Sequence, residues 1–151
     1  MEDKPRFAAD RMVIRLARWL RLLGADVISD PDIGGAELLN RARAERRILL
    51  TRDKRLRTAP DALFIASNDL RGQLAQVIHH FRIDPRSGAL TRCSLCNQPL
   101  ISVPKEAVAR RVPPFVFASN ERFAECERCG RIYWTATHPE RINAMLDSMG
   151  V

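Results

Sequence analysis

Four cysteines in two Cys-x-x-Cys pairs constrain the fold of this chain more than any other feature. The pairs are Cys93–Cys96 and Cys126–Cys129, with 29 residues between them. Two knuckles that each present two thiolates form a tetrahedral four-cysteine zinc site, with Zn–S bonds of about 2.3 Å. All four positions are then filled by protein, so the metal is structural rather than catalytic. We therefore predict one Zn²⁺ held by Cys93, Cys96, Cys126 and Cys129 in a small zinc ribbon.

Other uses of the four cysteines are less consistent with the rest of the sequence. Disulfides are typical of secreted proteins, but Met1–Pro5 has no apolar segment behind a basic start and does not read as a secretory signal. A single redox pair would not need the second pair. His138 is a spare potential ligand or a helix-entry residue ahead of Pro139. We expect a cytoplasmic protein.

The composition indicates a folded protein with an affinity for polyanions. The 151 residues are 46% hydrophobic and 28% charged, which excludes a disordered or low-complexity chain. No uncharged apolar run approaches the roughly 18 residues that a membrane helix needs. The net charge is +7, and the basic side chains are 22 arginines and three lysines. Because arginine binds phosphate oxygens bidentately, nucleic acid is a reasonable partner, although basic solvated surfaces are also common.

The sequence divides near residue 87 into two parts of different character. Residues 1–86 contain no cysteine, and Asp84–Gly88 reads as a turn and linker. We predict two domains, 1–86 and 87–151. Short apolar runs alternate with amphipathic helical patterns in the first, which is typical of an α/β fold with a parallel sheet. The metal ligands all lie in the second, so we expect zinc to be required for folding roughly residues 90–136.

The pattern predicts specific elements in each part. In 1–86, the expected strands are 7–9, 25–29, 48–51 and 62–66. The expected helices are 12–23, which Gly24 ends, then 35–46, which Asp32 caps, and 70–81. In 87–151, we expect β-like stretches at 100–103 and 131–134 and a last helix over 139–149.

Three carboxylates are expected at one edge of the sheet. Ligands of open parallel sheets gather beyond the carboxyl ends of the strands. Asp10 follows the first strand and Asp53 follows the third, so they face one crevice if these strands are neighbours. Glu37, in the first turn of the second helix, can point to the same edge. An oxygen-only set suits Mg²⁺ or Mn²⁺ rather than zinc.

Each carboxylate also has a simpler interpretation. Asp10 could cap the helix that follows it, and Asp53 could be a turn residue. Glu37 and Arg41 are spaced i,i+4 and could form a surface ion pair, worth about 0.3–0.5 kcal/mol.

A row of arginines begins beside Asp10. At 100° per residue, Arg11, Arg15, Arg18 and Arg21 fall on one stripe of the predicted helix. The stripe is either a phosphate-binding rail that leads into the carboxylate site or a solvated face opposite the apolar core.

These segments, taken in order, resemble a known family. The sequence is similar to the PIN-like ribonuclease domain with a C-terminal zinc ribbon, a unit named after the C-terminal region of the exonuclease Mut-seven. The resemblance covers essentially the whole chain. The matching stretches are Phe7–Met12, Leu16–Gly24, Glu37–Leu39, Arg47–Asp53, Arg92–Asn97 and Cys126–Trp134, with His138 after them.

The resemblance implies a compact PIN-like fold and metal-dependent cleavage of RNA, and we expect an endonuclease. Asp10, Glu37 and Asp53 stand at the positions of the family's catalytic, Mg²⁺- or Mn²⁺-binding acids. We count Arg11, Arg15, Arg18, Arg21 and Arg52 as candidate RNA contacts. Tyr133 and Trp134 either stack on bases or belong to the ribbon core. The alternative is a non-catalytic RNA-binding or assembly module with a relict site.

Overall fold

The α/β fold predicted for the first part is confirmed. The computed structural model describes residues 4–88, 91–134, 144 and 147. Its first sheet has four parallel strands in the order β2-β1-β3-β4. The strands are β1 (Arg6–Ala9), β2 (Asp26–Ser29), β3 (Ile48–Thr51) and β4 (Ala62–Phe64).

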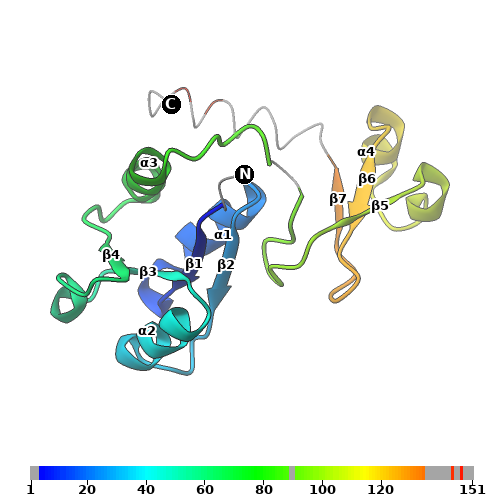
Figure 1. Cartoon of the computed structure of the whole chain (residues 1–151). Coiled ribbons are helices and arrows are strands. Elements are labelled where there is room, and N and C mark those ends of the chain that lie inside the picture. Colours follow the sequence, from blue (N-terminus) through cyan, green and yellow to red (C-terminus); the bar gives the residue numbers. More distant parts are fainter. Residues whose placement is uncertain (1–3, 89–90, 135–143, 145–146, 148–151) are drawn as a thin grey trace.

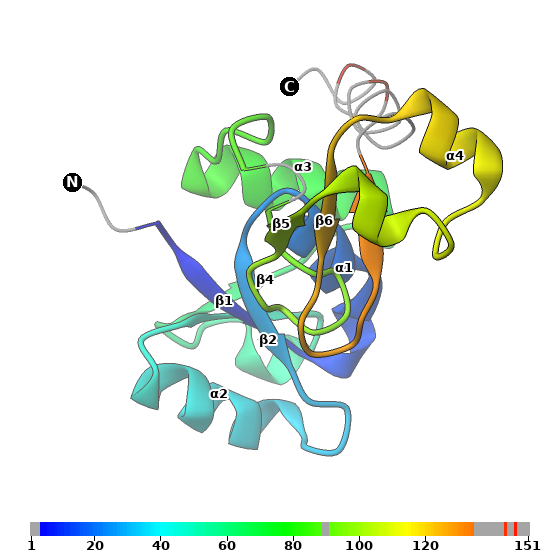
Figure 2. The same ribbon diagram turned by 90° about the vertical axis from the view of Figure 1, so that its right-hand side faces the viewer.

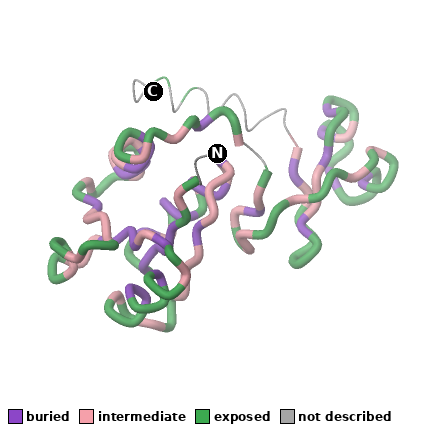
Figure 3. The backbone as a smooth tube through the Cα atoms, viewed as in Figure 1, coloured by how far each residue is buried: buried purple, intermediate pink, exposed green. Residues whose placement is uncertain are grey.

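Helices cover both faces of this sheet (Figure 1). They are α1 (Ile14–Leu22), α2 (Gly35–Ala44) and α3 (Leu70–Phe81). Phe7 and Ala9 of β1 pack in one apolar cluster with residues of α1 and α3, whereas Ala8 packs in a second cluster with residues of α2. The purple segments of Figure 3 include most of β1 and β3, the two central strands, whereas β2 and β4 at the edges are mainly pink, as expected of a sheet covered on both faces.

Most of the predicted boundaries hold, and the exceptions have local causes. Helix α3 spans the predicted residues, and Asp69 caps it by accepting a hydrogen bond from the Gly72 amide at 2.9 Å. Helix α2 ends at Ala44 because Arg46 has φ +56°, which a right-handed helix cannot continue. The prediction that Asp32 caps α2 is wrong, since Gly34 occupies the cap position without a side-chain bond.

The start of α1 also differs from the prediction. Residues 11–13 form a short 3₁₀ helix before α1 begins at Ile14. Gly24 follows the end of α1 with φ +96°, the left-handed conformation expected of a residue that ends a helix. An added Cβ at Gly24 would lie 2.4 Å from the carbonyl oxygen of Gly88, so only glycine allows this approach of the linker.

The second part contains a three-stranded antiparallel sheet, which faces the viewer in Figure 2. Its strands are β5 (Ile101–Val103), β6 (Phe123–Glu125) and β7 (Ile132–Trp134), with β6 in the centre. The sequence pattern predicted β5 and β7 but not β6. It also did not predict the helix α4 (Pro114–Ser119), because six residues are too few to show a helical period. The predicted helix 139–149 lies outside the described residues apart from positions 144 and 147.

No helix in the described part of the chain is long and apolar enough to cross a membrane.

Candidate functional site

The strand order places a switch of direction between β1 and β3. The chain leaves β1 through α1 to β2 on one side, then crosses by way of α2 to β3 on the other side. In open parallel sheets, ligands bind at such a point, beyond the carboxyl ends of the strands. Asp10 directly follows β1, and Asp53 comes two residues after β3. The expectation that these strands are neighbours is therefore confirmed, and both acids follow strands that flank the switch point.

Thr51 connects the two acids. Its side chain is fully buried, and its hydroxyl donates to Oδ2 of Asp10 while accepting a hydrogen bond from the Asp53 amide at 3.0 Å. This last residue of β3 thus orients both carboxylate positions. The sequence pattern placed Thr51 in the expected strand 48–51 and in the matching stretch Arg47–Asp53, but gave its side chain no role at the site. A hydroxyl at the end of an apolar run, two positions before an acid, is the signal that could have identified it.

Asp10 is a buried carboxylate without a cationic partner. The residue is 6% exposed and forms no ion pair with any described residue. Its Oδ1 accepts from the Met12 amide at 2.9 Å, so Asp10 does cap the 3₁₀ helix at 11–13. Two hydrogen bonds leave part of the acceptor capacity of a carboxylate unused. A buried negative charge is costly unless it is paired or coordinates a metal, so Asp10 is suited to a cation.

Asp53 is engaged by a neighbouring arginine. Arg55 donates from Nε to Oδ1 at 3.1 Å and from Nη2 to Oδ2 at 2.9 Å. The Arg55 amide also bonds to Oδ1, at 2.9 Å. The guanidinium of Arg55 and this amide hold the pKa of Asp53 below its ordinary value. The Arg55 side chain is 88% exposed, so a bound cation could displace it into solvent.

Glu37 lies in the first turn of α2 and is exposed. The ion pair with Arg41 that its spacing allowed is not formed, because Arg41 pairs with Glu45 at 2.9 Å and with Asp30 at 3.8 Å. An added Cβ at Gly35 would lie 3.7 Å from Oδ2 of Asp53, so the start of α2 adjoins Asp53.

The three carboxylates are not a tight cluster. Among the residues that the structure describes, only the four cysteines bring three or more candidate metal-ligand atoms within 4.8 Å of one another. The shared metal site of Asp10, Glu37 and Asp53 therefore stays a prediction.

The arginine row is shorter than predicted. Arg11, Arg15 and Arg18 are exposed. Arg21 is 5% exposed, and its guanidinium donates to the Val27 carbonyl at 2.8 Å, so it is engaged inside the fold, unlike the other three arginines of the row. Arg21 lies at the carboxyl end of the arginine row, where residues of the second part, such as Ser94, contact its guanidinium.

Arg52 is half-buried and fastens a loop. Its Nη1 donates to the carbonyl oxygens of Ile65 and Ser67 at 2.8 and 2.7 Å, and its Nη2 donates to Oδ1 of Asn68. These bonds join the turn that carries Asp53 to the loop between β4 and α3. Arg52 is therefore a positioning residue in this structure.

The four cysteines form a cluster that fits a zinc ion. Their Sγ atoms lie within 4.8 Å of one another, and none is in a disulfide. The Sγ atoms of Cys93 and Cys129 lie 3.8 Å apart. Two sulfur ligands of a tetrahedral zinc ion with Zn–S bonds of about 2.3 Å are separated by about the same distance. The disulfide alternative is not realised.

Electrostatics within the cluster favour a bound cation. Burial and the adjacent thiols raise the pKa of Cys96 to about 12. Burial also disfavours the Cys93 thiolate, but hydrogen bonds from Tyr133 and the Cys96 amide outweigh it and lower its pKa to about 7. The thiols therefore do not ionise together unless a metal compensates their charge.

Tyr133 belongs to the ribbon core. It is 8% exposed, and its hydroxyl lies 3.1 Å from Sγ of Cys93 and accepts from the Ser94 amide at 3.2 Å. Trp134 packs against the apolar cluster that includes Phe123. The structural interpretation of these two aromatic residues is therefore favoured over base stacking.

The first cysteine knuckle docks on the outer edge of β2. Asn97, with φ +61°, accepts from the Val27 amide at 2.9 Å and donates to Oδ1 of Asp26 at 2.8 Å. Arg21 completes the contact by donating to the Ser94 carbonyl at 3.0 Å. The knuckle thus satisfies the hydrogen-bonding groups that an edge strand otherwise exposes. Sequence reasoning missed this contact.

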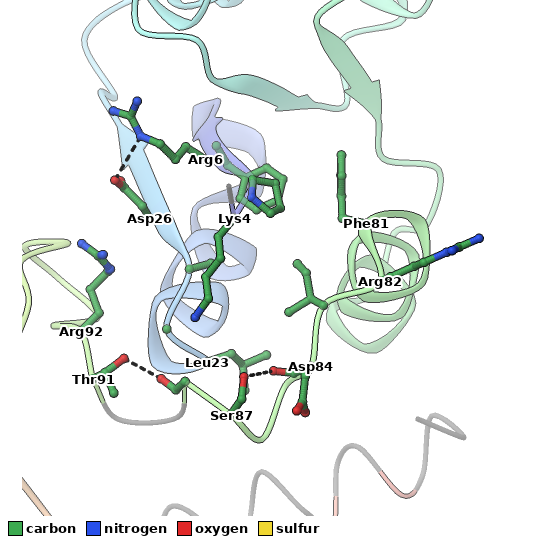
Figure 4. Close-up of a pocket in the computed structure, with 16 residues that line it drawn as sticks. Lys4, Arg6, Leu23, Asp26, Phe81, Arg82, Asp84, Ser87, Thr91 and Arg92 are labelled. Carbon is green, nitrogen blue, oxygen red and sulfur yellow. Dashed lines mark hydrogen bonds and ion pairs between the residues drawn. The ribbon is translucent and has the colours of Figure 1, made fainter. Parts of the chain in front are cut away.

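A cavity of about 590 Å³ lies at the amino-terminal ends of β1 and β2 (Figure 4). Its lining includes Lys4, Arg6 and Phe81, and Arg6 pairs there with Asp26 at 3.5 Å. The cavity adjoins the start of β1, whereas Asp10 follows the end of that strand. It therefore has no part in the carboxylate site.

Comparison with known protein families matches residues 5–146 to the Mut7-C RNAse domain. Comparison with curated proteins gives no match. The family match covers both the parallel sheet and the cysteine cluster, in agreement with the resemblance seen in the sequence. The chain belongs to the Mut7-C RNAse domain family.

Proposed function

We propose that this protein is a Mg²⁺- or Mn²⁺-dependent ribonuclease of the PIN-like type that cuts internal phosphodiester bonds. The observation that carries the proposal is the buried carboxylate of Asp10, which forms no ion pair with any residue that the structure describes and is linked through Thr51 to Asp53 at the switch point of the sheet. A nuclease-type family is consistent with it.

In this proposal the chain positions a metal and the RNA strand. Asp10, Asp53 and Glu37 supply carboxylate oxygens, the ligand type that suits Mg²⁺ and Mn²⁺. A bound ion would supply Lewis acidity at the phosphate and an activated water. Thr51 orients Asp10 and the Asp53 turn, and the exposed arginines of the row attract the phosphates. The zinc ribbon, with a structural Zn²⁺ on the four cysteines, assists RNA binding.

A non-catalytic RNA-binding module is the second candidate. The bidentate contact of Arg55 with Asp53 favours it, because this contact satisfies the carboxylate without a metal. In the ribonuclease Asp53 binds the metal, whereas in the binding module it only pairs with Arg55. A substitution of Asp53 therefore distinguishes the two candidates.

The test compares Asp53→Asn with wild type on mixed single-stranded RNA in Mn²⁺. We expect cleavage to fall to background while RNA affinity stays equal or rises slightly, because a negative charge is removed. Asp61→Asn is the matched control. Asp61 is exposed, lies outside the candidate site and forms an ion pair of 3.1 Å with Arg43. No cleavage by the wild-type protein would favour the binding module. Cleavage by Asp53→Asn at the wild-type rate would overturn the placement of Asp53 in the catalytic site.

A further inference from the structure

A second hollow adjoins the carboxylates. Its volume is about 280 Å³, and it lies between the residues that begin α1 and those that begin α3. Its lining begins at Arg11, the residue directly after Asp10. A ligand in this hollow would therefore sit beside the candidate metal site, at the carboxyl edge of the sheet.

The rim of the hollow is cationic. Arg11 and Arg15 line it, are exposed, and form no ion pair with the residues that the structure describes. Arg11 lies in the 3₁₀ helix that precedes α1, and Arg15 lies in the first turn of α1, so the two cations come from adjoining segments of the rim. Such arginines are available to the phosphates on either side of a nucleotide.

The hollow also offers an apolar surface. Met12 is 62% exposed although it lies among buried residues of the sequence such as Val13. Its flexible thioether side chain adapts to flat, polarisable groups. With Leu70 across the hollow, Met12 provides a surface for the face of a base.

Two anchored amides add hydrogen-bonding groups. Gln73 is 93% buried; its Nε2 donates to the Ser67 carbonyl at 3.0 Å, and its Oε1 accepts nothing from the described chain. Asn68 uses Oδ1 to accept from Arg52, which leaves its Nδ2 to donate. One free acceptor and one free donor are the groups that read the edge of an unpaired base.

Arg52 ties this hollow to the carboxylates. It lies next to Asp53 in the chain, and its guanidinium holds Asn68 as well as the carbonyl oxygens of Ile65 and Ser67. The amide of Asn68 therefore has a fixed position relative to the Asp53 turn.

We propose that this hollow is a nucleotide subsite that holds one unpaired base of an RNA strand beside the carboxylates. The proposal rests on the proposed function for the placement of the reacting phosphate, but base recognition is separable from cleavage. Cations, an apolar surface and paired hydrogen-bonding amides together fit a nucleotide better than a free anion.

The experiment measures binding of short oligo(A), oligo(C) and oligo(U) by fluorescence anisotropy, in an Asp53→Asn background without added Mn²⁺. We expect unequal affinities for the three. Asn68→Ala should lower the affinity for the preferred oligomer about fivefold, the effect of one hydrogen bond, and reduce the preference. Asn40→Ala, an exposed asparagine on α2, is the matched control and should change nothing.

Arginine variants separate phosphate contacts from base contacts. Arg11→Gln and Arg15→Gln should weaken all three oligomers alike and reduce the slope of log K against log salt by about 0.7 each. Arg71→Gln, on α3 but outside the hollow, should leave the slope nearly unchanged.

Equal affinity for the three oligomers, or an equal loss on all three in Asn68→Ala, would overturn the subsite. Failure of the ribonuclease proposal has a different signature, namely no cleavage by wild-type protein. An Asn68-dependent base preference in a protein that does not cleave would leave the subsite standing as part of a binding module.

Discussion

At the residue scale, the candidate site depends on which partner each carboxylate has. Asp10 is buried and forms no ion pair within the described part of the chain, whereas Asp53 already pairs with Arg55. The two acids therefore make different demands on a metal. Asp10 gains a partner when an ion binds, while Asp53 must first release its own.

We predict that Arg55→Gln strengthens Mn²⁺ binding severalfold, because the guanidinium no longer competes for both oxygens of Asp53. The measurement is isothermal titration of Mn²⁺ into zinc-loaded protein without RNA. Lys54→Gln is the control. It removes the same charge one position earlier in the chain, and the Lys54 side chain forms no ion pair with Asp53, whose partner is Arg55. Equal strengthening by both variants would show a general charge effect, and no change in Arg55→Gln would place the metal away from Asp53.

At the element scale, the outer edge of β2 connects the two parts of the chain. Asp26 is the centre of this contact: its Oδ1 accepts from Nη1 of Arg47 at 2.7 Å and from Nδ2 of Asn97 at 2.8 Å. Burial alone would raise the pKa of Asp26, but these two hydrogen bonds outweigh it and hold the pKa below its ordinary value.

This depressed pKa predicts an acid-sensitive edge. The ionised form of Asp26 stabilises the fold above the unfolded-state pKa of about 3.9, and that stability is lost as the pH falls through the lower folded-state pKa. We expect Asp26→Asn to lower the free energy of unfolding by about 1 kcal/mol at pH 7, a value reduced by solvent screening.

The difference between Asp26→Asn and wild type should shrink below about pH 4, because a protonated aspartic acid and asparagine are nearly isosteric and both uncharged. Urea unfolding at several pH values measures it, with Asp61→Asn as the exposed control. A difference that stays constant down to pH 3 would show that the charge of Asp26 is not what stabilises the edge.

At the scale of the whole molecule, the first cysteine knuckle covers the edge strand β2. Asn97 and Arg21 meet the backbone groups of Val27, and Arg21 also reaches the knuckle carbonyl of Ser94. The parallel sheet has its own apolar core on both faces. Loss of the knuckle should therefore loosen β2 without unfolding the sheet.

We predict this outcome for removal of zinc with a chelator and, equally, for Cys126→Ser. The ribbon should unfold, because metal binding supplies its folding free energy. Most of the helical circular dichroism should remain, since α1, α2 and α3 hold no zinc ligand. The amide of Val27 should lose protection from hydrogen exchange, because its acceptor is Asn97.

The amide of Leu50, in the centre of the sheet, is the internal reference and should stay protected. Collapse of the whole helical signal on chelation would show that the two parts fold as one unit. Full protection of Val27 in the zinc-free protein would show that the knuckle holds its position without metal.

The sequence by itself determined those features that arise between residues close together in the chain. Helix α3 has an apolar period and a capping Asp69, each parallel strand contains a short apolar run, and each cysteine knuckle is a contiguous motif. The acids Asp10 and Asp53 were also identified, because their distance from a strand end is a local property.

Only the tertiary structure decided which of these residues meet. The bridge through Thr51, the burial of Arg21 under the second part and the contact of Asn97 with β2 each join segments far apart in sequence. A helical stripe shows which residues share a face, but not what lies against that face. Burial and hydrogen-bond partners depend on the packing of non-contiguous elements, and no period within one element encodes them.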